Sequence, residues 1–324
     1  MSITYALDLP INEVGGPEHA KRALQGKETI MPANYSFVST DGTRLVYHVC
    51  GAGPLLLVAT CPGWGVGVDY MPSGMSELYT NGKITMVILQ TRGTFPSERP
   101  ADETRMGSRD MAIDLEALRI HLGQDKINIL GHSNGSGIVL TYAELFPEHC
   151  SKAVLIATQV IGYEKFRLDL KKALEKRAGD ERFANAVEIF SSPKLDAWRC
   201  ESDENLTQYL QDILPLYFFD PEPFIAQFID SMGPRLIQCW PFAKQEGPDS
   251  SEEANLIPGL HKVTANVLLI SGAEDFICSL EMSQVAIKGI GSKARHIAYE
   301  KCGHMQWVEH KEQFNEDILE FLGI

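Results

Sequence analysis

Short apolar runs alternate with longer amphipathic stretches along most of this chain. The runs "PLLLVAT", "ITMVILQ", "KINILG", "KAVLIAT" and "NVLLIS" are continuously apolar, which is typical of strands covered on both faces in a mostly parallel sheet. Two earlier runs flank "TDGT", where Asp-Gly predicts a tight hairpin, and "ARHIAYE" predicts a last strand at the sheet edge. The predicted strands are 35–39, 43–49, 54–60, 84–90, 126–131, 152–158, 266–271 and 294–300.

Helical patterns lie between these strands. In 108–123, four leucine and methionine residues share one face, and Gly123 ends the helix. The stretch "GIVLTYAELFPEHC" predicts a helix that stops at Pro147, and "HKEQFNEDILEFLGI" predicts an amphipathic helix at the end of the chain. Strand–helix alternation of this kind predicts an α/β fold, with a mostly parallel eight-stranded sheet covered by helices on both faces.

The alternation breaks after the sixth predicted strand. Residues 162–258 read as irregular helices with charged, aromatic and proline-rich pieces, and a clean strand returns at 266. We therefore expect a core made of 1–161 and 259–324, with 1–34 as an N-terminal extension, and a helical cap at 162–258; a separate second domain is the weaker alternative. An aromatic group in the cap predicts either a pocket roof or packing on the core: Tyr217, Phe218, Phe219, Phe224, Trp240 and Phe242.

Composition excludes several classes of function. The 324 residues carry a net charge of −14, whereas nucleic-acid binding needs a basic face. Seven scattered cysteines without a CxxC pair argue against a metal cluster or a disulfide framework and favour a reduced, cytoplasmic protein. No apolar segment reaches the ~20 residues that span a bilayer, and the N-terminus lacks a signal-peptide pattern. We expect no cofactor, metal, nucleic acid or membrane partner, while exposed cap helices allow a homodimer.

One short stretch, "KINILGHSNGSGI", carries the first candidate for chemistry. A predicted strand runs into Gly131-His-Ser-Asn-Gly135, and a predicted helix follows. In that context G-x-S-x-G predicts a strained strand-to-helix turn that exposes the hydroxyl of Ser133, with small residues required at both glycines. A glycine-rich loop with a chance serine would not be expected between a buried strand and a helix.

A serine nucleophile needs a histidine base and an acid that orients the histidine. Both partners are expected later in the chain, after strand ends, in the order Ser, Asp, His. Asp275 follows the strand at 266–271, with Glu274 as the weaker alternative, and His304 follows the last strand in "EKCGHMQ". The sequence therefore predicts a Ser133–His304–Asp275 triad.

Two backbone donors are expected for an oxyanion. One is the N–H of Asn134, which directly follows the serine, and the other comes from the loop after the third strand, "TCPGWGVGVDY". There Gly63 permits close backbone approach, and the N–H of Trp64 is the predicted second donor.

The strands, the serine turn and the late Asp and His resemble the α/β-hydrolase superfamily from residue 35 to the C-terminus. Within it, "PGWG", "TRGT", "DMAIDLEALRIHLGQDKINILGHSNGSG" and "CGHMQWVE" are similar to the proline iminopeptidase-like branch, whose fungal members often belong to secondary-metabolite pathways. The chain departs from the family pattern in two places. It has Pro62-Gly63 where many relatives carry His-Gly in the oxyanion loop, and in "QTRGTFPS" Gln90 and Phe95 replace Asp and Gly.

The expected function is a serine hydrolase that cleaves an ester or amide of a small organic or short peptide-like substrate through an acyl-enzyme. One alternative is a lyase, dehydratase or cyclase that uses the Ser–His pair as a general base on a natural product. Another is a binding module that keeps the triad only as structure. The aminopeptidase form would need acidic cap residues to hold a free amine, and the candidates are Glu201, Asp203, Glu204 and Glu222.

Overall fold

A nine-stranded sheet forms the centre of the molecule in the computed structural model, which describes residues 11, 12, 18 and 33–324. All eight predicted strands are present, which confirms the predicted α/β architecture, and a two-residue strand joins them at one edge. Most of the predicted N-terminal extension lies outside the described residues. The strands are β1 (Ile11–Asn12), β2 (Ala33–Val38), β3 (Arg44–Cys50), β4 (Leu55–Thr60), β5 (Ile84–Leu89), β6 (Ile127–His132), β7 (Cys150–Ile156), β8 (Asn266–Gly272) and β9 (Ala294–Tyr299).

The sheet is mostly parallel, with the order β1-β2-β3-β5-β4-β6-β7-β8-β9. Strand β3 pairs antiparallel with both β2 and β5, while the other neighbours are parallel. The predicted hairpin joins β2 to β3, and Gly42 takes the positive φ of 87° that the turn requires. Strand β9 lies at the edge, as "ARHIAYE" predicts.

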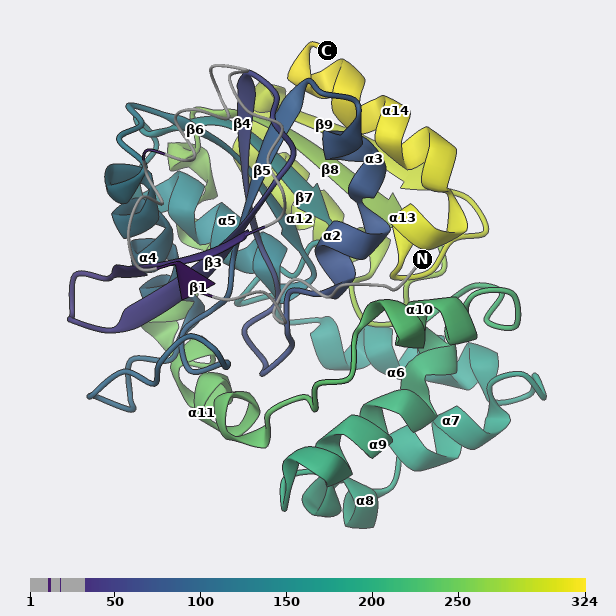
Figure 1. The fold of residues 1–324 in the computed structure, drawn as a ribbon. Helices are drawn as coiled ribbons and strands as arrows, with labels where there is room; N and C mark the ends of the chain where they lie inside the picture. Colours follow the sequence, from purple (N-terminus) through teal and green to yellow (C-terminus); the bar gives the residue numbers. More distant parts are fainter. Residues whose placement is uncertain (1–10, 13–17, 19–32) are drawn as a thin grey trace.

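Helices cover both faces of the sheet (Figure 1). Successive residues of β4 show why, because Leu56 and Val58 pack into one apolar cluster while Leu57 and Ala59 pack into the other. The continuously apolar strands are therefore buried on both sides. One face carries α4 (Ser108–His121), α5 (Asn134–Leu145) and α12 (Leu280–Ile290), and the other carries α2 (Tyr70–Gly74), α3 (Ser76–Thr80), α13 (Gln306–Glu309) and α14 (Lys311–Leu322).

A helical insertion, α6 to α11, lies between β7 and β8 and extends beyond one end of the sheet (Figure 1). It has its own small apolar cluster, centred on Phe183, Tyr209 and Leu216, which also contains Phe276 of the core. Among the described residues no helix is both long and apolar enough to cross a membrane. The insertion comprises α6 (Phe166–Arg177), α7 (Ala184–Phe190), α8 (Pro193–Trp198), α9 (Asp203–Ile213), α10 (Ile225–Ser231) and α11 (Cys239–Asp249), with 3-10 turns η2 (Leu214–Tyr217), η3 (Glu252–Ala254) and η4 (Ile257–Lys262).

Candidate active site

Ser133 occupies a strained turn between β6 and α5. Its backbone has φ 57° and ψ −123°, a conformation that costs free energy for a residue with a side chain. A Cβ at Gly131 would lie 2.2 Å from the carbonyl oxygen of Gly135, and one at Gly135 would lie 2.6 Å from that of Thr60. Only glycine fits both positions, so the G-x-S-x-G spacing is a packing requirement of this turn.

Asp275 and His304 are in direct contact. His304 Nδ1 lies 2.7 Å from Asp275 Oδ2, and both residues are buried. The other oxygen, Asp275 Oδ1, accepts hydrogen bonds of 3.0 Å from the N–H groups of Ile277 and Cys278. Because a carboxylate can only accept, Nδ1 of the imidazole holds the proton and Nε2 is left as the basic nitrogen.

The loop that carries His304 is tied to the insertion through its backbone. The N–H of His304 donates to the carbonyl of Tyr217 at 2.7 Å. Glu309 accepts from the N–H of Gly303 at 2.6 Å with one oxygen and from Phe219 at 2.8 Å with the other. Burial raises the pKa of Glu309. This carboxylate therefore holds the histidine loop and the chain after η2 in one arrangement.

His132, next to the serine in sequence, packs against the loop that carries His304. Its ring centroid lies 4.7 Å from that of His304, and its Nε2 lies 3.3 Å from the backbone oxygen of His304. Nδ1 lies 3.0 Å from the hydroxyl of Tyr70, so Nε2–H donates and Nδ1 accepts. Burial lowers the pKa of His132 well below its ordinary value, which keeps the ring neutral. A packing role for this residue agrees with its place in the turn.

A cavity of about 440 Å³ separates the insertion from the core. Ser133, His304 and Trp64 line it together, so the structure brings two of the three predicted triad side chains to one solvent-accessible space. Tyr217 and Phe242 of the aromatic group also line it, whereas Phe218 is fully buried against the core. The aromatic group thus divides between the two predicted roles.

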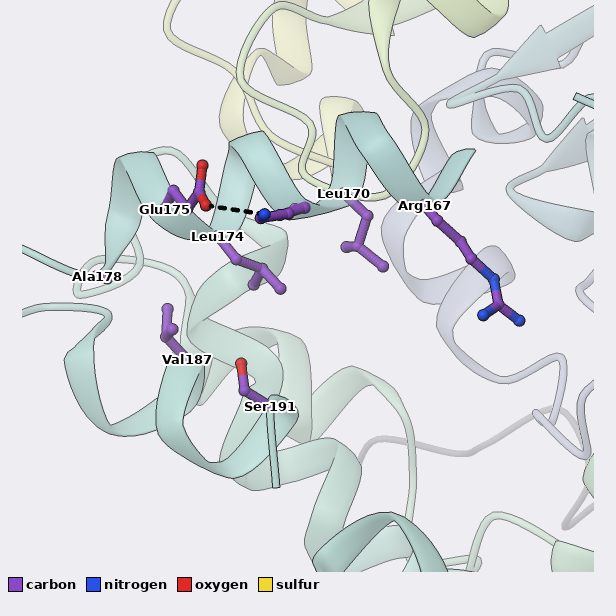
Figure 2. A pocket seen from close by; sticks show the side chains of 8 residues that line it. Arg167, Leu170, Leu174, Glu175, Ala178, Val187 and Ser191 are labelled. Carbon is purple, nitrogen blue, oxygen red and sulfur yellow. Dashed lines mark ion pairs between the residues drawn. The ribbon is translucent and has the colours of Figure 1, made fainter. Parts of the chain in front are cut away.

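A second hollow, of about 310 Å³, lies on the insertion alone (Figure 2). Figure 2 shows Leu170 and Leu174 of α6 above Val187 of α7, with an ion pair between Lys171 and Glu175 at its edge. It contains none of the predicted catalytic residues. The candidate site is therefore the larger cavity.

The thiol of Cys278 is a neighbour of the serine that the sequence did not predict. Ser133 and Cys278 both line the cavity, and in the described part of the chain no hydrogen bond joins Ser133 Oγ to His304. Burial raises the pKa of Cys278 well above its ordinary value, so the thiol stays protonated. Asp275, Cys278 and His304 hold atoms able to bind a metal within 4.8 Å of one another.

The two predicted oxyanion donors are N–H groups without an acceptor among the described residues, and one of them, Trp64, belongs to a residue that lines the cavity. Within the described residues, the N–H groups of Trp64 and Asn134 donate no hydrogen bond to the protein. The neighbouring N–H groups are used, because Gly63 donates to the side-chain oxygen of Asn134 at 2.9 Å and Gly65 donates to the carbonyl of Gly63. The indole of Trp64 packs on Phe242, with ring centroids 5.4 Å apart.

The family model for the alpha/beta hydrolase fold matches residues 54–311. The chain belongs to the α/β-hydrolase fold family. It is 22% identical over 320 residues to the 2-hydroxy-6-oxononadienedioate/2-hydroxy-6-oxononatrienedioate hydrolase of Paraburkholderia phymatum, covering 95% of this chain and 93% of the relative. The proline iminopeptidase of Xylella fastidiosa is 28% identical over 130 residues, 39% of this chain and 40% of the relative, so membership of that branch stays a prediction.

Solved structures share the fold of this α/β hydrolase. The esterase of Exiguobacterium antarcticum superposes with a TM-score of 0.64 at 20% identity, covering 89% of this chain and 99% of the esterase. The enol-lactonase of Burkholderia xenovorans superposes with a TM-score of 0.63 at 18% identity, covering 89% and 100%. Likenesses at this identity show the fold alone.

Gln90, which departs from the family pattern, and Arg92, which keeps it, hold the loop predicted to supply an oxyanion donor and its surroundings. Gln90 accepts a 3.1 Å hydrogen bond from the N–H of Val68 and donates to the carbonyl of Val66 at 3.4 Å. Arg92 is fully buried and bonds to Asp114 at 2.6 and 2.7 Å. The amide and the guanidinium therefore brace the turns beside the site, a role that only their tertiary contacts reveal.

The charged residues along the cavity are basic. Arg199 and Arg235, both from the insertion, line it, and the described lining residues include no aspartate or glutamate. In particular Asp203, a candidate amine ligand, instead accepts a hydrogen bond of 2.7 Å from the N–H of Cys239. The candidates predicted to bind a substrate amine lie outside this cavity: Glu201, Asp203, Glu204 and Glu222.

Proposed function

We propose that the protein is a serine hydrolase that cleaves an ester of a small, largely apolar carboxylic acid. Ser133 attacks the carbonyl carbon, His304 Nε2 accepts its proton, and Asp275 holds His304 in the required tautomer. The N–H groups of Trp64 and Asn134 stabilise the oxyanion, and water then releases the acyl group. The ester is our choice over an aminoacyl amide because the described residues that line the cavity include no acidic side chain for a substrate amine.

The observation that carries this proposal is the cavity that Ser133 and the Asp275-paired His304 line together. The Ser133 hydroxyl must hydrogen-bond to His304 Nε2 when substrate binds, and rotation about its χ1 angle allows this. In this arrangement residues 162–258 act as a lid, since the insertion supplies most of the cavity wall opposite Ser133.

The basic lining supports an anionic group on the substrate. Arg199 bonds to Asp196 at 2.5 Å through one terminal nitrogen, and its Nε is buried without a hydrogen-bond partner among the described residues. A buried donor of this kind favours an acceptor on the ligand. The name of the Paraburkholderia phymatum relative describes dicarboxylates, which is consistent with a carboxylate at the far end of the substrate from the scissile bond.

A fluorophosphonate probe tests the nucleophile. We expect stoichiometric labelling of the wild-type protein that Ser133→Ala abolishes, with a fall in esterase kcat of at least about 10³-fold. Turnover of the physiological substrate that survived in Ser133→Ala would point instead to the non-hydrolytic use of the Ser–His pair. Labelling that persisted in Ser133→Ala would contradict the proposed nucleophile.

A substrate panel tests the class. We expect p-nitrophenyl esters that end in a carboxylate to have a higher kcat/KM than neutral esters of equal length, and prolyl-naphthylamide to be left intact. Arg199→Met should reduce that preference about 10- to 150-fold, because one charge-assisted hydrogen bond contributes about 1.5–3 kcal/mol. Rapid cleavage of prolyl-naphthylamide would overturn the ester assignment.

A further inference from the structure

We infer that Gln245, on α11 of the insertion, is a positioning residue for the oxyanion loop of the core, given the hydrolytic function proposed above. The side chain of Gln245 reaches the backbone of Gly63 through Asn134, the residue after the nucleophile. Through this connection a lid helix sets the geometry of the oxyanion donors.

The amide of Asn134 is the centre of the connection, and its hydrogen-bonding capacity is fully used. Oδ1 accepts from the N–H of Gly63 and from Gln245 Nε2, each at 2.9 Å. Nδ2 donates to Ser108 Oγ at 3.1 Å and to Gln159 Oε1 at 2.9 Å. An amide offers two acceptor positions and two N–H groups, so this side chain has one orientation.

That orientation decides where the oxyanion donors point. The N–H of Gly63 is directed at Asn134, and the next N–H along the loop, that of Trp64, is left without a protein acceptor in the described chain. The backbone N–H of Asn134 itself is likewise unused. One side chain thus fixes both of the proposed donors, one through its own backbone and the other through the Gly63 bond.

Gln245 is also held in place, by burial and by the hydrogen bonds of its NH₂ group. It is fully buried, and its Nε2 donates to Asn134 Oδ1 and to Asp249 Oδ2, each at 2.9 Å. Its oxygen has no hydrogen-bond partner among the described residues and lies against Gly63, where a Cβ would come within 2.0 Å of it. Gly63 therefore has to be glycine to admit Gln245.

Asp249 anchors the same helix to the core. Its carboxylate accepts from the N–H of Ser108 at 2.7 Å and from the Ser108 hydroxyl at 2.8 Å, at the first residue of α4. This part of the insertion therefore keeps its place on α4 while it supports the loop. The Pro62-Gly63 pair lacks the His-Gly support expected in many relatives, and the insertion supplies the support instead.

The test is Gln245→Met, which keeps the length of the side chain and removes both N–H groups. We expect kcat for p-nitrophenyl butyrate to fall about 10- to 100-fold, since small misplacements at an active site have effects of that size. KM should stay within about twofold, and a trifluoromethyl ketone, which forms the oxyanion on Ser133, should bind weaker by the same factor. Gln245→Glu, which keeps the shape and exchanges the donors for an acceptor, should show the same loss.

Lys244→Met is the matched control on the same helix. It removes an ion pair of 2.8 Å with Glu103 of the core and leaves the Asn134 bonds intact, so kcat should stay within about twofold of wild type. In an Asn134→Leu background, Gln245→Met should reduce kcat little further, because its effect runs through Asn134.

Wild-type kcat and ketone affinity in both Gln245 variants would overturn the inference while leaving Ser133 labelling, and with it the proposed function, intact. An equal loss in Lys244→Met would also overturn it, because general loosening of the lid would then explain the effect. Absence of fluorophosphonate labelling in the wild-type protein would instead remove the proposed function on which the inference depends.

Discussion

Replacement of Asp275 by asparagine tests the proposed triad most directly, because the structure dictates how the new side chain must sit. Asp275 Oδ1 accepts two backbone N–H bonds of 3.0 Å, from Ile277 and Cys278. The single oxygen of asparagine will keep those bonds, so its NH₂ group must face His304 Nδ1, 2.7 Å away in the native protein. Two donors cannot share that contact, and the imidazole is forced to present a lone pair at Nδ1.

The proton of His304 then moves to Nε2, the nitrogen that must accept the serine proton. Catalysis through the wrong tautomer is slower by about 10⁴-fold, or about 5 kcal/mol in activation free energy. We therefore expect kcat for p-nitrophenyl butyrate to fall about 10⁴-fold in Asp275→Asn at pH 7.5. Fluorophosphonate labelling should slow by a similar factor, whereas the melting temperature should change by only a few degrees.

Glu274→Gln is the matched control, because Glu274 is the neighbouring acid and the weaker sequence candidate for the same role. Its side chain pairs with Lys176 at 2.5 Å near the surface, so we expect kcat within about twofold of wild type. A loss of less than tenfold in folded Asp275→Asn, or a larger loss in Glu274→Gln than in Asp275→Asn, would refute the assignment of the acid.

Three further changes test the surroundings of the site. Glu309→Gln should lower kcat about tenfold and the free energy of unfolding by about 1–3 kcal/mol, because its NH₂ would oppose a backbone N–H that the carboxylate now accepts. Asp114→Ala should lower the free energy of unfolding, measured in urea, by about 3–5 kcal/mol, since it leaves Arg92 buried without its main partner. Iodoacetamide at pH 7.5 should modify exposed Cys200 and spare Cys278, whose pKa is raised well above 9 by burial, as peptide mass spectrometry can show.

Each of these has a contrary result. Unchanged kcat in Glu309→Gln would mean that the histidine loop holds its position without the carboxylate. A loss below 1 kcal/mol in Asp114→Ala would mean that Arg92 finds water or another acceptor. Alkylation of Cys278 as fast as that of Cys200 would show that the thiol beside Ser133 is ionised or that the cavity opens widely.

The sheet could be predicted from the sequence because each strand has a recognisable local pattern of apolar residues. A run such as "ITMVILQ" is apolar at every position, and both faces of β5 are buried for that reason. The serine turn is equally local, since only glycine fits at Gly131 and Gly135. Asp275 and His304 could be placed because a parallel sheet brings the loops after its strands to one edge, whatever lies between them in the chain.

Residues whose contacts depend on tertiary packing could not be found in this way. Gln245 lies on an irregular helix, and no motif marks it in the sequence. It is 111 residues away from Asn134 along the chain, and the two side chains meet only because α11 packs on α4. The same holds for Cys278 beside Ser133 and for Arg199 on the cavity wall. No periodicity marks such residues, because each contact joins segments whose relative position is set by other side chains.

The sequence by itself determined the α/β sheet, the turn that exposes Ser133 and the residues from which a base and its acid would come, because these depend on backbone geometry and short-range pattern. Only the tertiary structure decided which side chains surround the serine, that two arginines lie on the cavity wall, and that Gln245 of α11 bonds to Asn134. The physical reason is that hydrogen bonds and burial act across space over about 3–4 Å, a distance that sequence separation does not encode.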